Sequence, residues 1–197
     1  MRIGSRDLVK AQAAAGRLRE TLPAADVEGL LNPDAAAAAA ISILTVPVNA
    51  QIATLKSIRG SLRPDSTLVD ATVPLEAAIG GSATRPLALF AGSAAQQAVR
   101  HVPPGVAVVA AFHALSAELL TNLEHEVDCD VLICGDQDRA KGEVRELVAM
   151  LPGARAIDAG PLENARLLET LTALLVSLNI RHKVKHAGVR ITGLGHA

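Results

Sequence analysis

The sequence is almost free of aromatic residues: its 197 residues include two Phe and no Trp or Tyr. Proteins that bind single-stranded nucleic acid stack the bases on aromatic side chains, so this composition argues against that class. Neither sign of charge dominates, because 19 Lys and Arg stand against 20 Asp and Glu. A balanced charge does not attract nucleic acid or an anionic membrane. We therefore expect small-molecule partners, with no nucleic acid and no membrane.

Cysteine is scarce as well. Cys129 and Cys134 have four residues between them, and no second pair completes a zinc site. We expect two buried structural thiols and no metal. No secretory signal is visible, since Met1 is followed at once by a polar, charged stretch, and we expect a cytoplasmic protein.

A long uncharged run covers residues 35–55. A membrane span needs about 20 apolar residues, but Pro47, Asn49 and Gln51 interrupt this run. A helix, a buried strand and a second helix account for it better.

Half of the residues are hydrophobic, so Ala, Leu, Val and Ile must fill the core. Short β-branched runs alternate with Ala-rich helical segments, which predicts a doubly wound, Rossmann-like α/β fold with a parallel sheet. Asp7 is a candidate cap for the first helix, and Asn32 for the second. The expected strands are 27–31, 41–46, 67–71, 106–112, 131–134 and 155–159. The expected helices are 8–20, 33–40, 48–58, 94–100, 116–123, 138–150 and 161–180.

The last of these helices carries Leu167, Leu171, Leu174 and Leu178 at spacings of three and four residues, which makes an apolar stripe. The stripe packs either on its own domain or in a homodimer interface, and the sequence leaves both open. We expect the basic tail at 181–190 to be a solvated helix end, whose cations interact favourably with the negative end of the helix dipole.

The opening segment GSRDLVK places Ser5 and Arg6 where a strand ends and a helix begins. In dinucleotide-binding folds an Arg at this place accommodates the 2′-phosphate of NADP. Lys10 follows Arg6 by four residues, on the same side of a helix. A hydroxyl, a guanidinium and an ammonium together form a plausible phosphate socket.

Seven segments, in order, resemble the F420-dependent NADP reductases: GSRDLVKAQ, SILTVP, AGSAAQ, VVAAFHALSA, CDVLICGD, DAGPLENARLLETLTALL and HAGVRITGL. The resemblance implies hydride transfer between NADP(H) and coenzyme F420. Hydride passes directly between the two cofactors, so no catalytic side chain is required. Related domains also occur in ferric reductases, so an NADPH-dependent ferric or flavin reductase remains an alternative function.

The same resemblance implies the contacts of the two cofactors. Ser5, Arg6 and Lys10 would bind the 2′-phosphate, Val46 and Pro47 would border the nicotinamide, and Ala117 would meet its carboxamide. The deazaflavin would contact His113, Arg166, Thr170 and Thr172. Arg166 and Thr170 share a helix face, but Thr172 points to the other side, so the three cannot meet a flat ring in the same way.

Relatives of this kind have a strand, a glycine-rich loop and a helix ahead of the position of Ser5, where this sequence has four residues. We therefore expect residues 1–160 to form an NADP-binding domain without its first strand-helix unit, and residues 161–197 to complete the F420 site. The missing strand would leave two strand edges unpaired. Either the gene product starts about 25 to 30 residues upstream, or the chain is a non-catalytic protein that binds nucleotide or deazaflavin.

Overall fold

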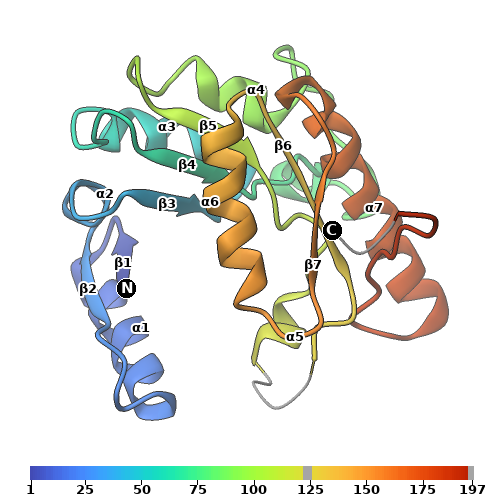
Figure 1. The fold of residues 1–197 in the computed structure, drawn as a ribbon, viewed down its shortest axis with the longest axis horizontal. Helices are drawn as coiled ribbons and strands as arrows, with labels where there is room; N and C mark the ends of the chain where they lie inside the picture. The colour runs from blue at the N-terminus through green and yellow to red at the C-terminus, as the bar shows by residue number, and fades with distance from the viewer. Residues whose placement is uncertain (122–125, 195–197) are drawn as a thin grey trace.

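The computed structural model describes residues 1–121 and 126–194, which form an α/β fold with its helices around the strands (Figure 1). The strands are β1 (Arg2–Ser5), β2 (Glu28–Leu31), β3 (Ile41–Leu44), β4 (Thr67–Asp70), β5 (Ala107–Ala110), β6 (Asp130–Gly135) and β7 (Arg155–Asp158). The α-helices are α1 (Leu8–Thr21), α2 (Asn32–Ala37), α3 (Val48–Ile58), α4 (Ala94–Val99), α5 (Ala117–Thr121), α6 (Asp138–Ala149) and α7 (Ala165–His182). Two short 3-10 helices, η1 (Glu76–Ile79) and η2 (Leu162–Asn164), complete the set.

The described strands form two sheets. Five of them are ordered β3-β4-β5-β6-β7, and β1 pairs with β2 alone. All pairs are parallel except β5 and β6, which meet antiparallel through Val109 with Gly135 and Ala110 with Cys134. The predicted Rossmann-like α/β fold with a long C-terminal helix is confirmed, and its sheet is mixed rather than wholly parallel.

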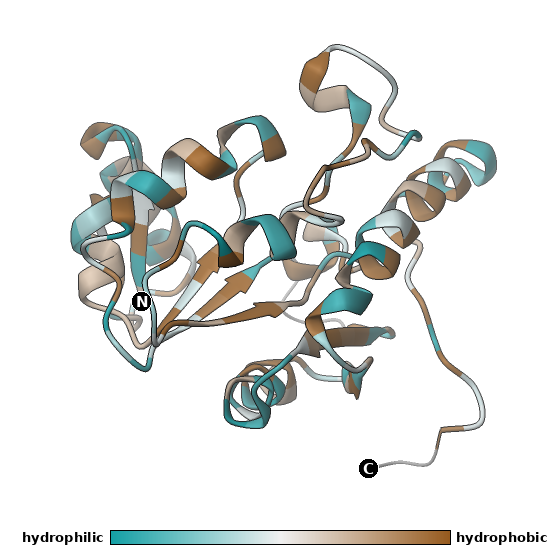
Figure 2. Ribbon diagram, turned by 90° about the horizontal axis from the view of Figure 1, so that it is seen from above, coloured by the Kyte–Doolittle hydropathy of each residue, from teal (hydrophilic) through white to brown (hydrophobic). Residues whose placement is uncertain are grey.

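The core lies on both faces of the five-stranded sheet, because successive side chains of a strand point to opposite sides. Leu68 and Val108 pack on the side of α3, α4 and α7, whereas Val69 and Val109 pack against α6. Figure 2 shows the apolar strands running between helices above and below.

Most expected elements are confirmed to within a few residues. Asp7 caps α1 through bonds from the amides of Val9 and Lys10. Asn32, expected as a cap, is instead the first residue of α2, and its side chain makes no cap bond. Of the helix expected at 116–123, residues 122 and 123 lie outside the described part.

The uncharged run at 35–55 resolves into the end of α2, all of β3 and most of α3. Within the described residues, no helix has the length and apolarity needed to cross a membrane.

The β1–α1–β2 lobe stands apart from the remaining sheet, at the lower left of Figure 1. Gly29 lets α1 lie directly on β2, since a Cβ there would overlap the backbone of Ala11. Among the described strands, both β1 and β3 are edge strands, each paired on one side only. The expected pair of unpaired edges is thus confirmed, and a groove separates them.

Candidate functional site

The carboxyl ends of β3, β4 and β5 share one edge of the sheet, where open α/β sheets bind their ligands. The backbone continues from β3 into Thr45 and from β5 through Phe112 into His113. Phe112 has a φ of 70°, a left-handed conformation that costs energy in a residue with a side chain and is concentrated at functional sites. The strained backbone aims the next residue, His113, toward α7.

His113 is buried, with 7% of its surface exposed. Neither ring nitrogen has a hydrogen-bond partner among the described residues. Burial lowers the pKa of His113 to about 4, so the ring is neutral at pH 7 and offers one donor and one acceptor. Because buried polar groups are nearly always hydrogen-bonded, an imidazole left without partners marks a place where a ligand can bind.

Helix α7 presents its predicted ligand residues on two sides. The Thr172 hydroxyl donates to the carbonyl oxygen of His113 at 2.9 Å and thereby joins α7 to the end of β5. On the outward side, Thr170 donates to the Arg166 carbonyl oxygen at 2.7 Å, and both side chains are exposed. Thr170 therefore bonds the preceding helical turn, as a threonine within a helix often does.

At the end of β1, Ser5 accepts a hydrogen bond from the amide of Asp7 at 3.2 Å. Arg6 precedes the capping residue, so it does not share a helix face with Lys10, contrary to the expectation. Both cations are exposed, and neither has an ion pair within the described part of the chain. Two unpaired cations close to Ser5 can receive an anionic group.

The remaining predicted residues lie at the starts of helices. Pro47 is the cap residue of α3, and the half-buried Val46 before it packs against the core. Ala117 is the exposed first residue of α5. The hydroxyl of Ser116 donates to the Lys185 carbonyl oxygen at 3.2 Å, so this turn lies beside the segment that follows α7.

The two cysteines are buried and unpaired, as expected. Burial raises the pKa of both thiols, that of Cys134 to about 11, so neither is a thiolate at neutral pH. No group of three or more metal-ligating side chains occurs within residues 1–121 and 126–194.

No family model matches the chain. It is 49% identical over 195 residues to the F420-dependent NADP reductase of Methanothermobacter thermautotrophicus, an alignment that covers 98% of this chain and 84% of the relative. The F420-dependent NADP reductase of Methanocaldococcus jannaschii is 40% identical over 196 residues, covering 98% and 87% of the two chains. This chain belongs to the F420-dependent NADP reductase family.

A solved structure agrees with that placement. A protein from Arthrobacter sp. FB24, described as an F420-dependent NADP-reductase, superposes with a TM-score of 0.80 at 25% identity and covers 97% of this chain and 87% of its own. The UDP-D-ManNAc dehydrogenase of Pyrococcus horikoshii superposes at 0.59 with 10% identity over 90% of this chain and 43% of its own, which supports the Rossmann-like fold alone.

In this reductase, sequence reasoning missed a buried polar cluster between α3, α4 and α7. The Glu169 carboxylate, 3% exposed, accepts from the amides of Ala94 at 2.9 Å and Ala95 at 3.1 Å. Gln51 donates to the Ala94 carbonyl oxygen at 3.0 Å and to the carboxylate of the fully buried Asp70. The sequence did contain a sign of this cluster, because the acidic Glu169 directly follows Leu168 on the inner, apolar face of α7.

Burial raises the pKa of both carboxyl groups, that of Glu169 to about 7. The nearby Asp70 raises the pKa of Glu169 further, while hydrogen bonds from the amides of Ala94 and Ala95 lower that pKa. The cluster ties α7, with its predicted F420 residues, to the helices beside the predicted NADP site. The cluster therefore fixes α7 against α3 and α4.

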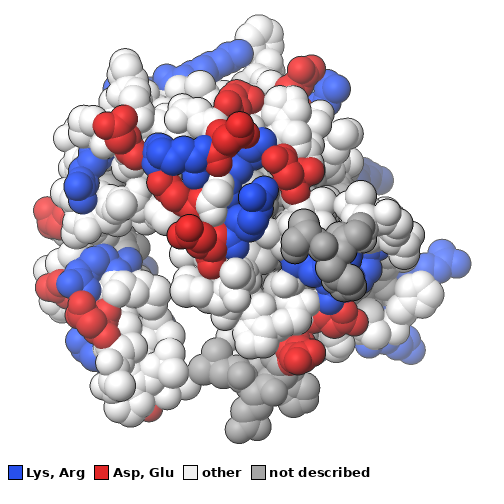
Figure 3. Space-filling view, viewed as in Figure 1, with Lys and Arg blue, Asp and Glu red and all other residues white. Residues whose placement is uncertain are grey.

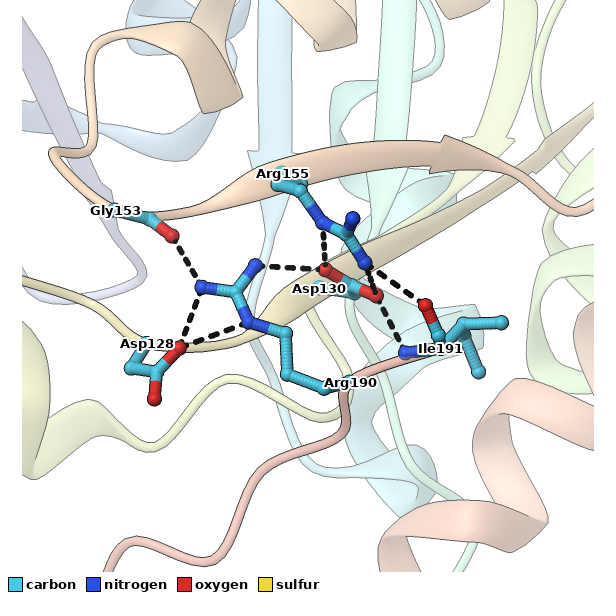
Figure 4. A network of polar contacts seen from close by, with 6 residues as sticks. All are labelled: Asp128, Asp130, Gly153, Arg155, Arg190 and Ile191. Carbon is cyan, nitrogen blue, oxygen red and sulfur yellow. Dashed lines mark hydrogen bonds and ion pairs between the residues drawn. The ribbon is translucent and has the colours of Figure 1, made fainter. Parts of the chain in front are cut away.

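Arg181 and His182 lie exposed in the last turn of α7, as expected of a solvated helix end, but the later part of the basic tail does not remain solvated. Beyond α7 it returns to the start of β6, where Arg190 donates to Asp128 at 2.6 Å and to Asp130 at 2.9 Å (Figure 4). Arg155 of β7 donates twice to Asp130, both times at 2.8 Å, and the amide of Ile191 donates to it at 2.7 Å. In Figure 3 charges of both signs alternate over the middle of this face, where α6 and β7 lie. The tail is thus held by paired charges.

Proposed function

We propose that this chain transfers a hydride between NADP(H) and coenzyme F420. The observation that carries the proposal is the 49% identity to an F420-dependent NADP reductase over 98% of the chain. When bound, the two cofactors supply the hydride donor and acceptor themselves, so the protein has to hold them in contact and exclude water. No side chain acts as a catalytic acid or base in that step.

The NADP end of the proposed site is at β1 and β3. Arg6 and Lys10 receive the 2′-phosphate, and Ser5 beside them adds a hydroxyl. Their lack of ion pairs in the described residues supports this role, since neither cation has to leave a carboxylate to bind an anion. Val46 and Pro47 border the nicotinamide, and the Ala117 backbone meets its carboxamide.

The F420 end is formed by the turn after β5 and by α7, so that residues 161–197 complete the site. The partnerless imidazole of His113 supports this placement, because a ligand that hydrogen-bonds to it removes the cost of a buried unsatisfied group. Arg166 and Thr170 lie outward on α7 and contact the deazaflavin from that side. On the other side of α7, Thr172 holds the backbone of His113 in place through its hydrogen bond to the His113 carbonyl oxygen.

The direct test follows the deazaflavin absorbance while the purified 197-residue chain is mixed with F420 and NADPH. We expect bleaching that depends on both the protein and NADPH. A chain that binds F420 without turnover would instead be a non-catalytic binding protein. Preference for a ferric chelate or a flavin in the same assay would indicate the other reductase branch.

Arg6→Ala tests the NADP end. Loss of a charge-assisted contact is expected to weaken NADPH binding by about 1.5 to 3 kcal/mol and to leave NADH binding unchanged. Arg17→Ala is the matched control, because Arg17 is exposed on the same lobe two turns beyond Lys10. Equal NADPH affinity in wild type and Arg6→Ala would show that Arg6 does not bind the 2′-phosphate.

We also propose that the protein is a cytoplasmic homodimer that associates through α7. Leu168 and Leu175 are buried on their own domain, whereas Leu167 and Leu174 are 60% and 55% exposed. An exposed apolar stripe favours a partner surface. Leu174→Lys is expected to weaken self-association at least tenfold in light scattering across a dilution series. A wild-type chain that is monomeric throughout the series would refute the dimer.

A further inference from the structure

Helix α7 is joined to its neighbours by two polar side chains that lie about one helical turn apart. The Glu169 carboxylate is 3% exposed and accepts one amide on each of its oxygens, from Ala94 at 2.9 Å and from Ala95 at 3.1 Å. Three residues later, Thr172 donates to the His113 carbonyl oxygen at 2.9 Å. Residues three apart are neighbours on a helix surface. Glu169 and Thr172 therefore bind two different partners from the inner side of α7.

These two hydrogen-bonding groups determine how α7 is turned about its own axis. The buried Leu168 and Leu175 make apolar contacts, and hydrophobic attraction has no preferred direction. Hydrogen bonds do have one, because they weaken steeply when donor, hydrogen and acceptor are out of line. Arg166 precedes Glu169 by about one turn and Thr170 follows it directly. The orientation of Glu169 therefore also sets the orientation of these two predicted F420 residues.

Stability alone does not account for a carboxylate at this place. No ion pair to Glu169 occurs in the described part of the chain. Helix α4 faces Glu169 with backbone amides, and the charged group that acts on it is Asp70 of β4, a second buried acid. Burial raises the pKa of Glu169 to about 7, which shows that its charged form is costly here. A neutral side chain would avoid that cost.

The cluster continues from α4 to α3. Gln51 of α3 donates to the Ala94 carbonyl oxygen at 3.0 Å, and its own oxygen accepts from Gln97 of α4 at 2.8 Å. Helix α3 begins directly after Pro47, one of the residues predicted to border the nicotinamide. Hydrogen bonds therefore connect the start of α3 to the Ala94 peptide and, through Glu169, to α7. This connection joins the two ends of the proposed site.

We propose that Glu169 is a positioning residue for F420, whose carboxylate fixes the rotation of α7 and so directs Arg166 and Thr170 toward the deazaflavin. The inference rests on the proposed function, because it takes F420 as the ligand of α7. Glu169 itself does not contact the cofactor. Only the carboxylate can accept both amides well, since a protonated acid or an amide has one good acceptor oxygen in place of two.

Glu169→Gln tests the proposal through equilibrium binding, which needs no turnover. At about pH 8, where wild-type Glu169 is mostly ionised, deazaflavin fluorescence is expected to give an F420 dissociation constant about tenfold or more above that of the wild type. The NADPH dissociation constant is expected to stay within about twofold. Glu163→Gln is the matched control, because Glu163 is exposed, and it is expected to bind F420 as the wild type does.

The pattern of binding separates positioning from a merely structural role. Folded Glu169→Gln that binds F420 as the wild type does, or that loses F420 and NADPH alike, overturns this inference and leaves the proposed function standing. A wild type that binds no F420 overturns both. The ratio of the F420 dissociation constants, variant to wild type, is expected to fall toward one at about pH 6, where wild-type Glu169 is largely protonated. The titration of F420 itself cancels in this ratio, and a ratio that does not change with pH overturns the inference.

Hydrogen exchange in the wild type provides a test that does not depend on the folding of a variant. A ligand that needs the closed cluster also holds the cluster closed, by linkage. F420 is therefore expected to slow exchange about tenfold or more at the amides of Ala94 and Ala95, which are fully buried and out of its reach. Unchanged exchange at these two amides in the presence of saturating F420 overturns the inference even if Glu169→Gln fails to fold.

Discussion

Replacing Asp130 by Asn should destabilise the protein more than any neutralisation of a surface carboxylate nearby. The Asp130 side chain is fully buried and accepts four hydrogen bonds, two from Arg155, one from Arg190 and one from the Ile191 amide. Asn keeps the shape but has one acceptor oxygen in place of two. The variant therefore leaves donors of β7 and of the tail without acceptors.

The magnitude follows from those contacts. Breaking a buried ion pair on one side costs about 3 to 5 kcal/mol, because the remaining charge is unpaired. Here the Arg155 and Arg190 side chains are 25% and 34% exposed and reach water, which reduces the cost. We expect Asp130→Asn to lower the free energy of unfolding by about 2 to 3 kcal/mol.

Urea unfolding measures the change as a shift of the midpoint at constant slope. Asp128→Asn is the matched control, since Asp128 belongs to the same network but is 86% exposed, and it should cost about 0.5 kcal/mol or less.

Hydrogen bonding from Arg155 chiefly holds the pKa of Asp130 well below its usual 3.8. Its stabilisation is therefore complete above about pH 4 and is lost as the pH falls through the lower, folded-state pKa. Equal effects of the two substitutions would refute this reasoning.

Two further predictions concern α7. Burial raises the pKa of Glu169 from 4.5 to about 7, so the folded state holds a proton that the unfolded state releases. As the pH rises from about 4.5 to 7, the free energy of unfolding of the wild type should fall, and Glu169→Gln should abolish this decrease. Glu163→Gln, at an exposed site, should behave as wild type across a series of urea titrations. Thr172→Val should cost about 1 kcal/mol and raise the KM for F420, because the hydrogen bond to the backbone of His113, in the turn proposed to contact F420, is lost. Thr170→Val, which removes only a bond within the helix, should leave stability nearly unchanged, and equal losses in both would contradict the proposed role of Thr172.

Several features of the site were accessible from the residues themselves. Asp7 indicated the start of α1 and so placed Ser5 at a strand end. The apolar β-branched run from Ile41 predicted a strand that ends before Pro47, as β3 does. The predicted burial of that strand is wrong, because β3 is an edge strand of the described sheet and Ile43 is 49% exposed. The leucine spacing predicted the long helix α7. Which face of α7 is covered was not predictable, and neighbours distant in the chain cover Leu168 and Leu175 while leaving Leu167 and Leu174 exposed.

By itself, the sequence determined the order of helices and strands, because caps, prolines and side-chain periodicity act over a few residues. The family followed from the resemblance of seven ordered segments. Only the tertiary structure decided the antiparallel pairing of β5 with β6, the burial of Glu169 on α4 and the return of the tail to Asp130. Each joins residues far apart in the chain. The same holds for the groove between β1 and β3, since an unpaired edge is a property of the neighbours that a strand finds in space and not of its own four residues.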